Sequence, residues 1–191
     1  MPRDLEKLTS EELGHLFPII ISEPKTEWKE LFIQEKKEII ALLGENMAIR
    51  VEHIGSTAVP NLAAKPTIDI LVEIPEGEEV KEKIISIMLS NGYKHVPEPT
   101  HLMIVKGYTP DGFKGQSYHI HMGTKKSVDL WDRLYFRDYL IENPFTANEY
   151  AGLKKDLESR YRYDRDGYTE AKTVFIKRVT DIAKKRFSNR Q

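Results

Sequence analysis

The residues best suited to chemistry in this chain lie between Glu52 and Asp69. Gly55-Ser56 follows a short extended run. Glycine there lets the backbone approach a ligand, and serine adds a hydroxyl. Successive backbone N–H groups in such a turn suit a phosphate. Asp69 stands alone in an apolar run, where an unpaired carboxylate is unfavourable, so it must be paired, hydrogen-bonded or bound to a metal.

Two histidines downstream are candidates for the same site. His119 and His121 are two residues apart in a predicted strand, so both side chains lie on one face of it. Together with Asp69 they are candidate ligands of a divalent metal. The alternative is that the two imidazoles form hydrogen bonds, face a phosphate or serve the structure alone.

Four further residues carry open alternatives. Lys65 is a candidate phosphate-binding point charge or a solvated loop lysine. His53, just before Gly55, is expected either to line the same pocket or to be a satisfied core histidine. Lys154 and Lys172 are expected to be structural or solvated.

Hydrophobic periodicity predicts the elements that position these residues. A helix runs from Trp28 to Leu43 and ends at Gly44, and a second spans Glu78 to Asn91. Strands are predicted from Met47 to His53, from Thr67 to Ile74, near Leu102–Lys106 and near Ser117–Met122. After Ser127 three helices are expected. Capping boxes are predicted at Thr9–Glu12 and Thr146–Glu149.

This segregated order predicts an α+β fold rather than a doubly wound sheet. We expect one domain over residues 1–191, with a mixed sheet of four or five strands at about 47–122, flanking helices, and a C-terminal helical segment at about 127–187. Asp69 is expected on an inner strand, with Gly55-Ser56 beside it at the mouth of a cleft.

A strand, a Gly-Ser turn and a second strand bearing Asp resemble the nucleotidyltransferase fold, in which the turn holds a triphosphate and strand carboxylates bind Mg²⁺. Longer stretches resemble the GrpB family: His53–Pro60, Ala64–Pro66, Ile68–Ile70, His119–His121, Phe136–Leu140, Glu149–Lys154 and Tyr168–Lys172. The family is classed with nucleotidyltransferase-like folds and is sometimes fused to dephospho-coenzyme A kinase. Its own reaction does not follow from this resemblance.

One departure from the active nucleotidyltransferase pattern bears on the metal. Two carboxylates on one strand face hold two Mg²⁺ ions about 3.5–4 Å apart in two-metal enzymes. Here Leu71 occupies the second position. The implied cofactor is one divalent ion, Mg²⁺ or Mn²⁺ by the resemblance, whereas a histidine pair beside Asp69 would suit Mn²⁺, Zn²⁺ or Fe²⁺ better.

Two functions therefore stand side by side. In the first, the protein binds a nucleotide and transfers a nucleotidyl group to a small acceptor, with Asp69 catalytic and His53, Gly55, Ser56 and Lys65 binding the substrate. In the second, it is a non-catalytic module for a phosphate-bearing ligand that has lost the second metal carboxylate. Whether the protein is an enzyme stays open.

Composition limits the partners. The 191 residues include no cysteine, which excludes disulfides and thiolate metal sites, and the net charge is −1. The segment 151–191 holds 12 Lys/Arg against 6 Asp/Glu, a local +6. Without an aromatic stacking platform beside it, a nucleic-acid partner is not expected. The lack of a long apolar run predicts a cytoplasmic protein with no membrane partner, and the oligomeric state is open.

Overall fold

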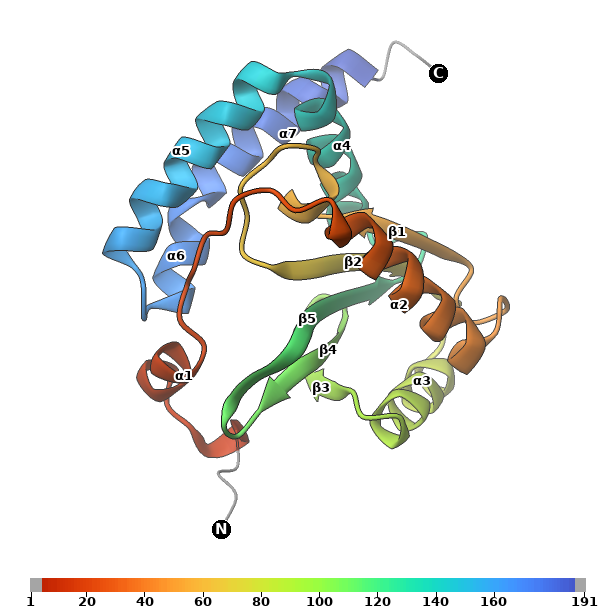
Figure 1. Ribbon diagram of the computed structural model, residues 1–191. Coiled ribbons are helices and arrows are strands. Elements are labelled where there is room, and N and C mark those ends of the chain that lie inside the picture. Colours follow the sequence, from red (N-terminus) through yellow and green to blue (C-terminus); the bar gives the residue numbers. More distant parts are fainter. Residues whose placement is uncertain (1–4, 188–191) are drawn as a thin grey trace.

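A five-stranded mixed sheet lies at the centre of the computed structural model, which describes residues 5–187 (Figure 1). The strands are β1 (Arg50–Ile54), β2 (Thr67–Glu73), β3 (Lys94–Val96), β4 (Leu102–Thr109) and β5 (Gly112–Gly123). The helices are α1 (Ser10–Leu16), α2 (Glu27–Leu43), α3 (Glu78–Ser90), α4 (Val128–Glu142), α5 (Pro144–Arg160), α6 (Arg165–Ala171) and α7 (Thr173–Phe187). Short 3₁₀ turns occupy Leu5–Lys7 and Ser56–Ala58.

The strand order is β1-β2-β5-β4-β3. Only β2 and β5 run parallel, and the other neighbouring pairs are antiparallel. β2 is therefore an inner strand paired on both sides, as its continuous apolar sequence predicts. The α+β class, the mixed sheet and the inner position of Asp69 are confirmed.

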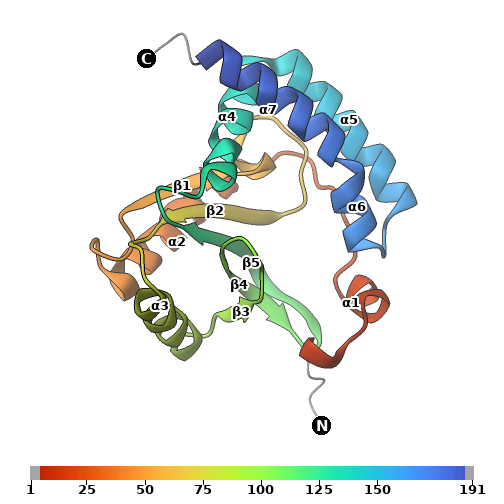
Figure 2. The same cartoon turned by 180° about the vertical axis from the view of Figure 1, so that it is seen from behind.

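Side chains that alternate along β2 and β5 separate two environments. Ile68, Ile70 and Val72 of β2 belong to the main core, which α2 and α3 cover. Thr67, Asp69 and Leu71 point to the opposite face, on the side of α4 to α7. Figure 2 shows these four helices from behind, standing over one side of the sheet. The polar residues of β2 and β5 therefore face the C-terminal helices.

The main core contains one buried ionic group. Glu35 of α2 is 4% exposed and accepts hydrogen bonds from Tyr93 Oη at 2.6 Å and Lys106 Nζ at 2.8 Å. The Lys106 ammonium also lies 4.8 Å from the centre of the Tyr93 ring. These partners satisfy a charge that would otherwise strongly disfavour burial.

The helix boundaries confirm some predictions and correct others. The Thr9–Glu12 capping box is present, and Gly44 ends α2 with φ +73°. The Thr146–Glu149 capping box is wrong, because α5 already begins at Pro144 with Asn143 before it. Proline at the first helical position loses no intrahelical hydrogen bond. Four helices rather than three follow Ser127, since a turn near Lys172 separates α6 from α7.

The segment between α1 and α2 bridges two distant parts of the chain. Phe17 packs edge-on against Tyr108 and Phe113 at the end of the β4–β5 hairpin, with ring centroids 5.0 Å apart in each case. Ile19 N–H donates to the Arg162 carbonyl at 2.7 Å. The bridging segment thus ties the hairpin to the C-terminal helices. Among residues 5–187, no helix is both long and apolar enough to span a bilayer.

Candidate functional site

Asp69 lies directly against the Gly55-Ser56 turn. Ile54 pairs with Asp69 across β1 and β2, so the turn that leaves β1 folds over the Asp69 side chain. Gly55 has φ +71°, and a Cβ there would lie only 2.3 Å from Asp69 Oδ2. Glycine is thus required both by the backbone conformation and by the nearby carboxylate. The predicted proximity of Asp69 and Gly55-Ser56 is confirmed.

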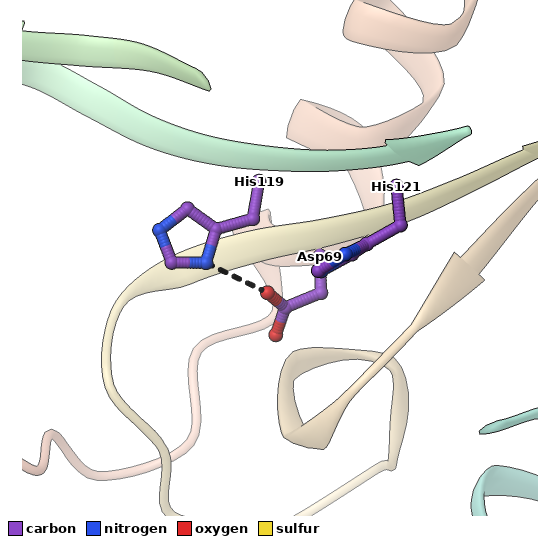
Figure 3. A group of neighbouring side chains, drawn as sticks. All are labelled: Asp69, His119 and His121. Atoms are coloured by element: carbon purple, nitrogen blue, oxygen red, sulfur yellow. Dashed lines mark ion pairs between the residues drawn. The ribbon is translucent and has the colours of Figure 1, made fainter. Parts of the chain in front are cut away.

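His119 and His121 meet Asp69 because of the parallel register. Asp69 is the direct partner of His119 on β5, and Leu71 is the partner of His121. One nitrogen of each histidine and one Asp69 oxygen all lie within 4.8 Å of one another. His119 Nδ1 is 3.3 Å from Asp69 Oδ1, the contact dashed in Figure 3. The structure brings these three residues together as predicted.

Each histidine uses its second nitrogen for another protein group. His119 Nε2 is 2.6 Å from the Tyr108 hydroxyl oxygen, and the two rings stack at 5.6 Å. His121 Nδ1 is 2.9 Å from His101 Nε2. The other nitrogen of His101 lies 3.0 Å from Thr100 Oγ1. A chain of hydrogen bonds therefore fixes both rings from outside the three-residue group.

Burial and nearby charges shift the pKa values of Asp69, His119 and His121 in opposite directions. Burial tends to raise the pKa of Asp69, but the hydrogen bond from His119 and the surrounding positive charges outweigh it and lower that pKa to about 2. Burial lowers the pKa of His119 even though Asp69 opposes the shift, and it lowers the pKa of His121 well below the usual value. At neutral pH the site holds a carboxylate and two neutral imidazoles.

The donor types of this set, and the spacing of its His119–Asp69 pair, suit one divalent ion. Two ligands held about 2.1 Å from one ion lie roughly 3–3.5 Å apart, which matches the 3.3 Å between His119 Nδ1 and Asp69 Oδ1. Leu71 shares the Asp69 face but is fully buried in an apolar cluster with Ile54 and Leu130. It therefore fills the position that a second carboxylate takes in two-metal sites. Neutral imidazoles beside one carboxylate suit borderline transition metals better than Mg²⁺.

Three lysines lie across the cleft from this group. Lys154 of α5 is 2% exposed and donates a hydrogen bond to the Ala63 carbonyl. Lys172 lies between α6 and α7, and its Nζ is 4.1 Å from the Tyr168 ring centre. Lys65 Nζ is 5.6 Å from the same ring centre. Within residues 5–187, no carboxylate is close enough to any of these ammonium groups to form an ion pair.

Burial lowers the pKa of all three lysines. The neighbouring positive groups reinforce the effect, and Asp69 partly opposes it. The pKa falls to about 8 for Lys65 and to about 7 for Lys154 and Lys172. Such shifts in a cleft are typical of functional groups, although structural clusters also produce them.

The lysines and the Asp69 group share one cleft of about 680 Å³ between the sheet and helices α4 to α7. Arg133 of α4 and Arg165 of α6 also line it. Arg165 donates to the Phe17 carbonyl at 2.8 Å, so the bridging segment holds this guanidinium in place. The predicted site residues Gly55, Ser56, Lys65, Asp69, His119 and His121 all line this cleft.

His53 is the exception among the predicted site residues. Its side chain points to the α2 side of the sheet, where it stacks on Phe32 at 4.7 Å and lies 3.0 Å from Thr57 Oγ1. It lines a separate hollow of about 610 Å³ beside α2. Burial lowers its pKa to about 4. The expectation that His53 might share the Asp69 pocket is thus corrected, because adjacent strand residues face opposite sides.

Sequence reasoning expected Lys154 and Lys172 to be structural or solvated, and it did not single out Tyr108 or His101. Lys154 follows Tyr150 by four positions and precedes Leu157 by three, so its place on a buried helix stripe was readable. Lys172 likewise follows the buried Tyr168 by four positions. Tyr108 and His101 gave no such signal, because their approach to the histidines depends on the pairing of β4 with β5.

The cleft is that of an α+β domain with a Gly-Ser turn and a strand carboxylate, the class that the sequence predicts. A cationic wall formed by Lys65, Lys154 and Lys172, which the sequence did not predict, faces the carboxylate. The family model described as GrpB protein matches residues 18–181, and the chain belongs to the GrpB family. The UPF0157 protein YqkA of Bacillus subtilis is 35% identical over 176 residues, which are 90% of this chain and 50% of YqkA. This chain thus spans about half the length of that relative.

One solved structure gives the same family assignment. The conserved protein GrpB from Enterococcus faecalis is 34% identical with a TM-score of 0.77, and the match covers 88% of this chain and 99% of that chain. A cytoplasmic RNA terminal U-transferase matches at 13% identity and a TM-score of 0.43, covering 76% of this chain and 46% of that one. Nothing about activity follows from so distant a likeness.

Proposed function

We propose that the cleft binds a small phosphate-bearing molecule, such as a nucleotide. The observation that supports this most directly is the set of Lys65, Lys154 and Lys172, three buried or half-buried lysines that face one cleft and have no carboxylate partner within residues 5–187. Buried ammonium groups are unfavourable unless they are paired. A phosphate supplies the missing negative charge and accepts several charge-assisted hydrogen bonds.

The helix side and the sheet side of the cleft have different roles in binding the ligand. The lysine wall and Arg165 hold phosphoryl groups, and the Gly55-Ser56 turn contributes its backbone and hydroxyl from the sheet side. The aromatic side chains of the cleft, Phe136, Tyr150 and Tyr168, are all buried and are not a platform on which bases of a nucleic acid stack. This favours a small molecule over a nucleic acid.

Transfer of a nucleotidyl group is the second candidate. It is favoured by the adjacency of Asp69, His119 and His121 to the phosphate-binding wall, since an ion there would polarise the α-phosphate. Asp69 would hold the ion while the lysines orient the phosphates for attack by an acceptor hydroxyl. Leu71 weighs against two-metal chemistry, so binding without turnover is the function better supported.

Relatives extend the list of ligands worth testing. One similar protein is named dephospho-CoA kinase, from Mycolicibacterium paratuberculosis; it is 26% identical over 187 residues, and this chain covers 44% of it. Dephospho-coenzyme A and its precursors therefore belong in a screen beside ATP and UTP. They test the same property, which is recognition of phosphoryl groups by the cationic wall.

Titration calorimetry with each compound in excess chelator tests the binding function directly. We expect a ligand that binds the wild type and binds Lys172→Met about 10- to 100-fold more weakly, because a hydrogen bond to a charged group contributes about 1.5–3 kcal/mol. The matched control is Lys177→Met, which removes the same charge from an exposed position of α7. Equal affinity in Lys172→Met and the control would contradict the proposal.

The enzyme candidate has its own assay. Release of pyrophosphate from nucleoside triphosphates, with small hydroxyl acceptors and each of Mg²⁺, Mn²⁺ and Zn²⁺, measures transfer directly. Activity that disappears in Asp69→Asn would establish catalysis. Tight ligand binding with no release of pyrophosphate under any of these conditions would leave the binding module as the function.

A further inference from the structure

We propose that Asp69, His119 and His121 form a site for a single transition-metal ion, of the Zn²⁺, Co²⁺ or Mn²⁺ kind, and that Tyr108 and His101 are its positioning residues. This site would hold the ion of the second candidate function, nucleotidyl transfer. Only the chemical role of the ion rests on that function. Binding of the ion is tested with the metal alone.

The hydrogen bond between His119 and Tyr108 suits both states of the site. Without an ion, the carboxylate 3.3 Å from His119 Nδ1 favours the tautomer with its proton on Nδ1, and the Tyr108 hydroxyl, 2.6 Å from Nε2, then donates to that nitrogen. With an ion on Nδ1, the proton of the neutral ring must sit on Nε2 and donate to the Tyr108 oxygen. A hydroxyl can serve in either direction, whereas a carbonyl or an ammonium group cannot.

His101 plays the equivalent part for His121. His101 Nε2 lies 2.9 Å from His121 Nδ1, so Nε2 of His121 is the nitrogen that can coordinate the ion. Thr100 Oγ1 holds the far side of His101 at 3.0 Å. Protein metal sites characteristically fix each ligand histidine through its second nitrogen, and loss of that partner weakens metal affinity by about 10- to 100-fold.

The sheet makes this arrangement rigid before any ion arrives. Asp69 and His119 are direct register partners on two inner strands, and His121 follows on the same face. His121 is only 8% exposed, and its ring meets that of His119 at 88° and 6.4 Å. The ligands come from strands rather than loops, so ion binding requires little ordering of the chain.

The same geometry selects against Mg²⁺. That ion demands near-octahedral oxygen ligands, and here the protein offers one carboxylate and two nitrogens. Fully buried Leu71 prevents a further carboxylate from joining on the Asp69 face. Imidazole nitrogens instead favour first-row transition-metal ions over Mg²⁺.

Metal titration of the full chain, stripped with chelator and dialysed, tests the site. We expect one equivalent of Co²⁺ to give visible d–d absorption, Zn²⁺ to displace it, and millimolar Mg²⁺ to leave it unchanged. Asp69→Asn and His119→Gln should abolish the signal. No stoichiometric Co²⁺ or Zn²⁺ binding by the wild type, or displacement of Co²⁺ by Mg²⁺, would overturn the assignment.

Two variants test the positioning residues, and two variants outside the cleft are their matched controls. Tyr108→Phe and His101→Gln should each weaken Zn²⁺ affinity about 10- to 100-fold. Tyr163→Phe and His95→Gln, outside the cleft, should leave it unchanged. Affinities are measured where circular dichroism shows each variant folded. Wild-type Zn²⁺ affinity in both Tyr108→Phe and His101→Gln would refute their role. Ligand titrations in chelator decide phosphate binding separately.

Discussion

Replacing Leu71 with aspartate would recreate the two-carboxylate pattern of active nucleotidyltransferases in the sequence. The structure predicts that this change destabilises the protein instead of building a Mg²⁺ site. Leu71 is fully buried and packs with Ile54 and Leu130 beneath α4. The new carboxylate would enter that apolar contact and lie on the same strand face as Asp69, which is itself ionised.

The expected loss follows from two contributions. Truncating a buried leucine lowers the free energy of unfolding by about 2–5 kcal/mol. An uncompensated buried charge lowers it by several kcal/mol more. The sum, at least about 5 kcal/mol, equals or exceeds the lower end of the stability of a typical domain, about 5–15 kcal/mol. Leu71→Asp should therefore be largely unfolded or acquire a neutral carboxyl group.

Urea denaturation with and without millimolar Mg²⁺ measures the outcome. Leu71→Asn is the control, because it loses the same packing without introducing a charge, and it should be less destabilised. A Leu71→Asp protein that keeps the wild-type midpoint and gains stability from Mg²⁺ would refute the reasoning, since it would show that the position tolerates a hydrated carboxylate.

Three further outcomes are expected. Because the pKa values of Lys154 and Lys172 lie at about 7 and that of Lys65 at about 8, these cations lose charge as pH rises from 6 to 9, and calorimetry should show phosphate affinity falling over that range. Gly55→Ala should lower the melting temperature more than Gly92→Ala, because both have positive φ but only the first places a Cβ 2.3 Å from Asp69 Oδ2. Glu35→Gln removes a charge-assisted hydrogen bond to Lys106 and should cost about 1.5–3 kcal/mol in urea unfolding, against at most about 1 kcal/mol for Glu76→Gln in the exposed pair with Lys126. A pH-independent affinity, equal melting temperatures or equal losses would contradict these expectations in turn.

The sequence predicted four of the five strands, because these four have clear signals, and it missed the short edge strand β3. The apolar β-branched run from Thr67 to Ile74 indicated an inner strand, and alternation placed His119 and His121 on one face. Pairing with Asp69 then followed from the resemblance to a known fold. The structure confirms that the three residues converge. Whether they hold an ion stays a prediction.

The cationic wall was harder to predict. A lysine on an amphipathic helix usually extends into solvent, so the helix stripes that include Lys154 and Lys172 do not by themselves show that both ammonium groups face the sheet. That orientation depends on packing between elements far apart in the chain, including the bridging segment that holds Arg165 through Phe17. The reason for Gly55 was also missed, since the nearby Asp69 carboxylate, as well as any ligand, requires it.

The parallel pairing of β2 with β5 also sets the order in which the site can assemble during folding. Asp69 and His119 become neighbours only after the intervening chain, with α3, β3 and β4, has closed into the sheet. Contacts of such long sequence separation form slowly, because the entropy of loop closure must be overcome first. The three side chains are scattered in the nascent chain. Any ion or phosphate compound that binds here would therefore meet a complete site only at the end of folding, and would not nucleate it.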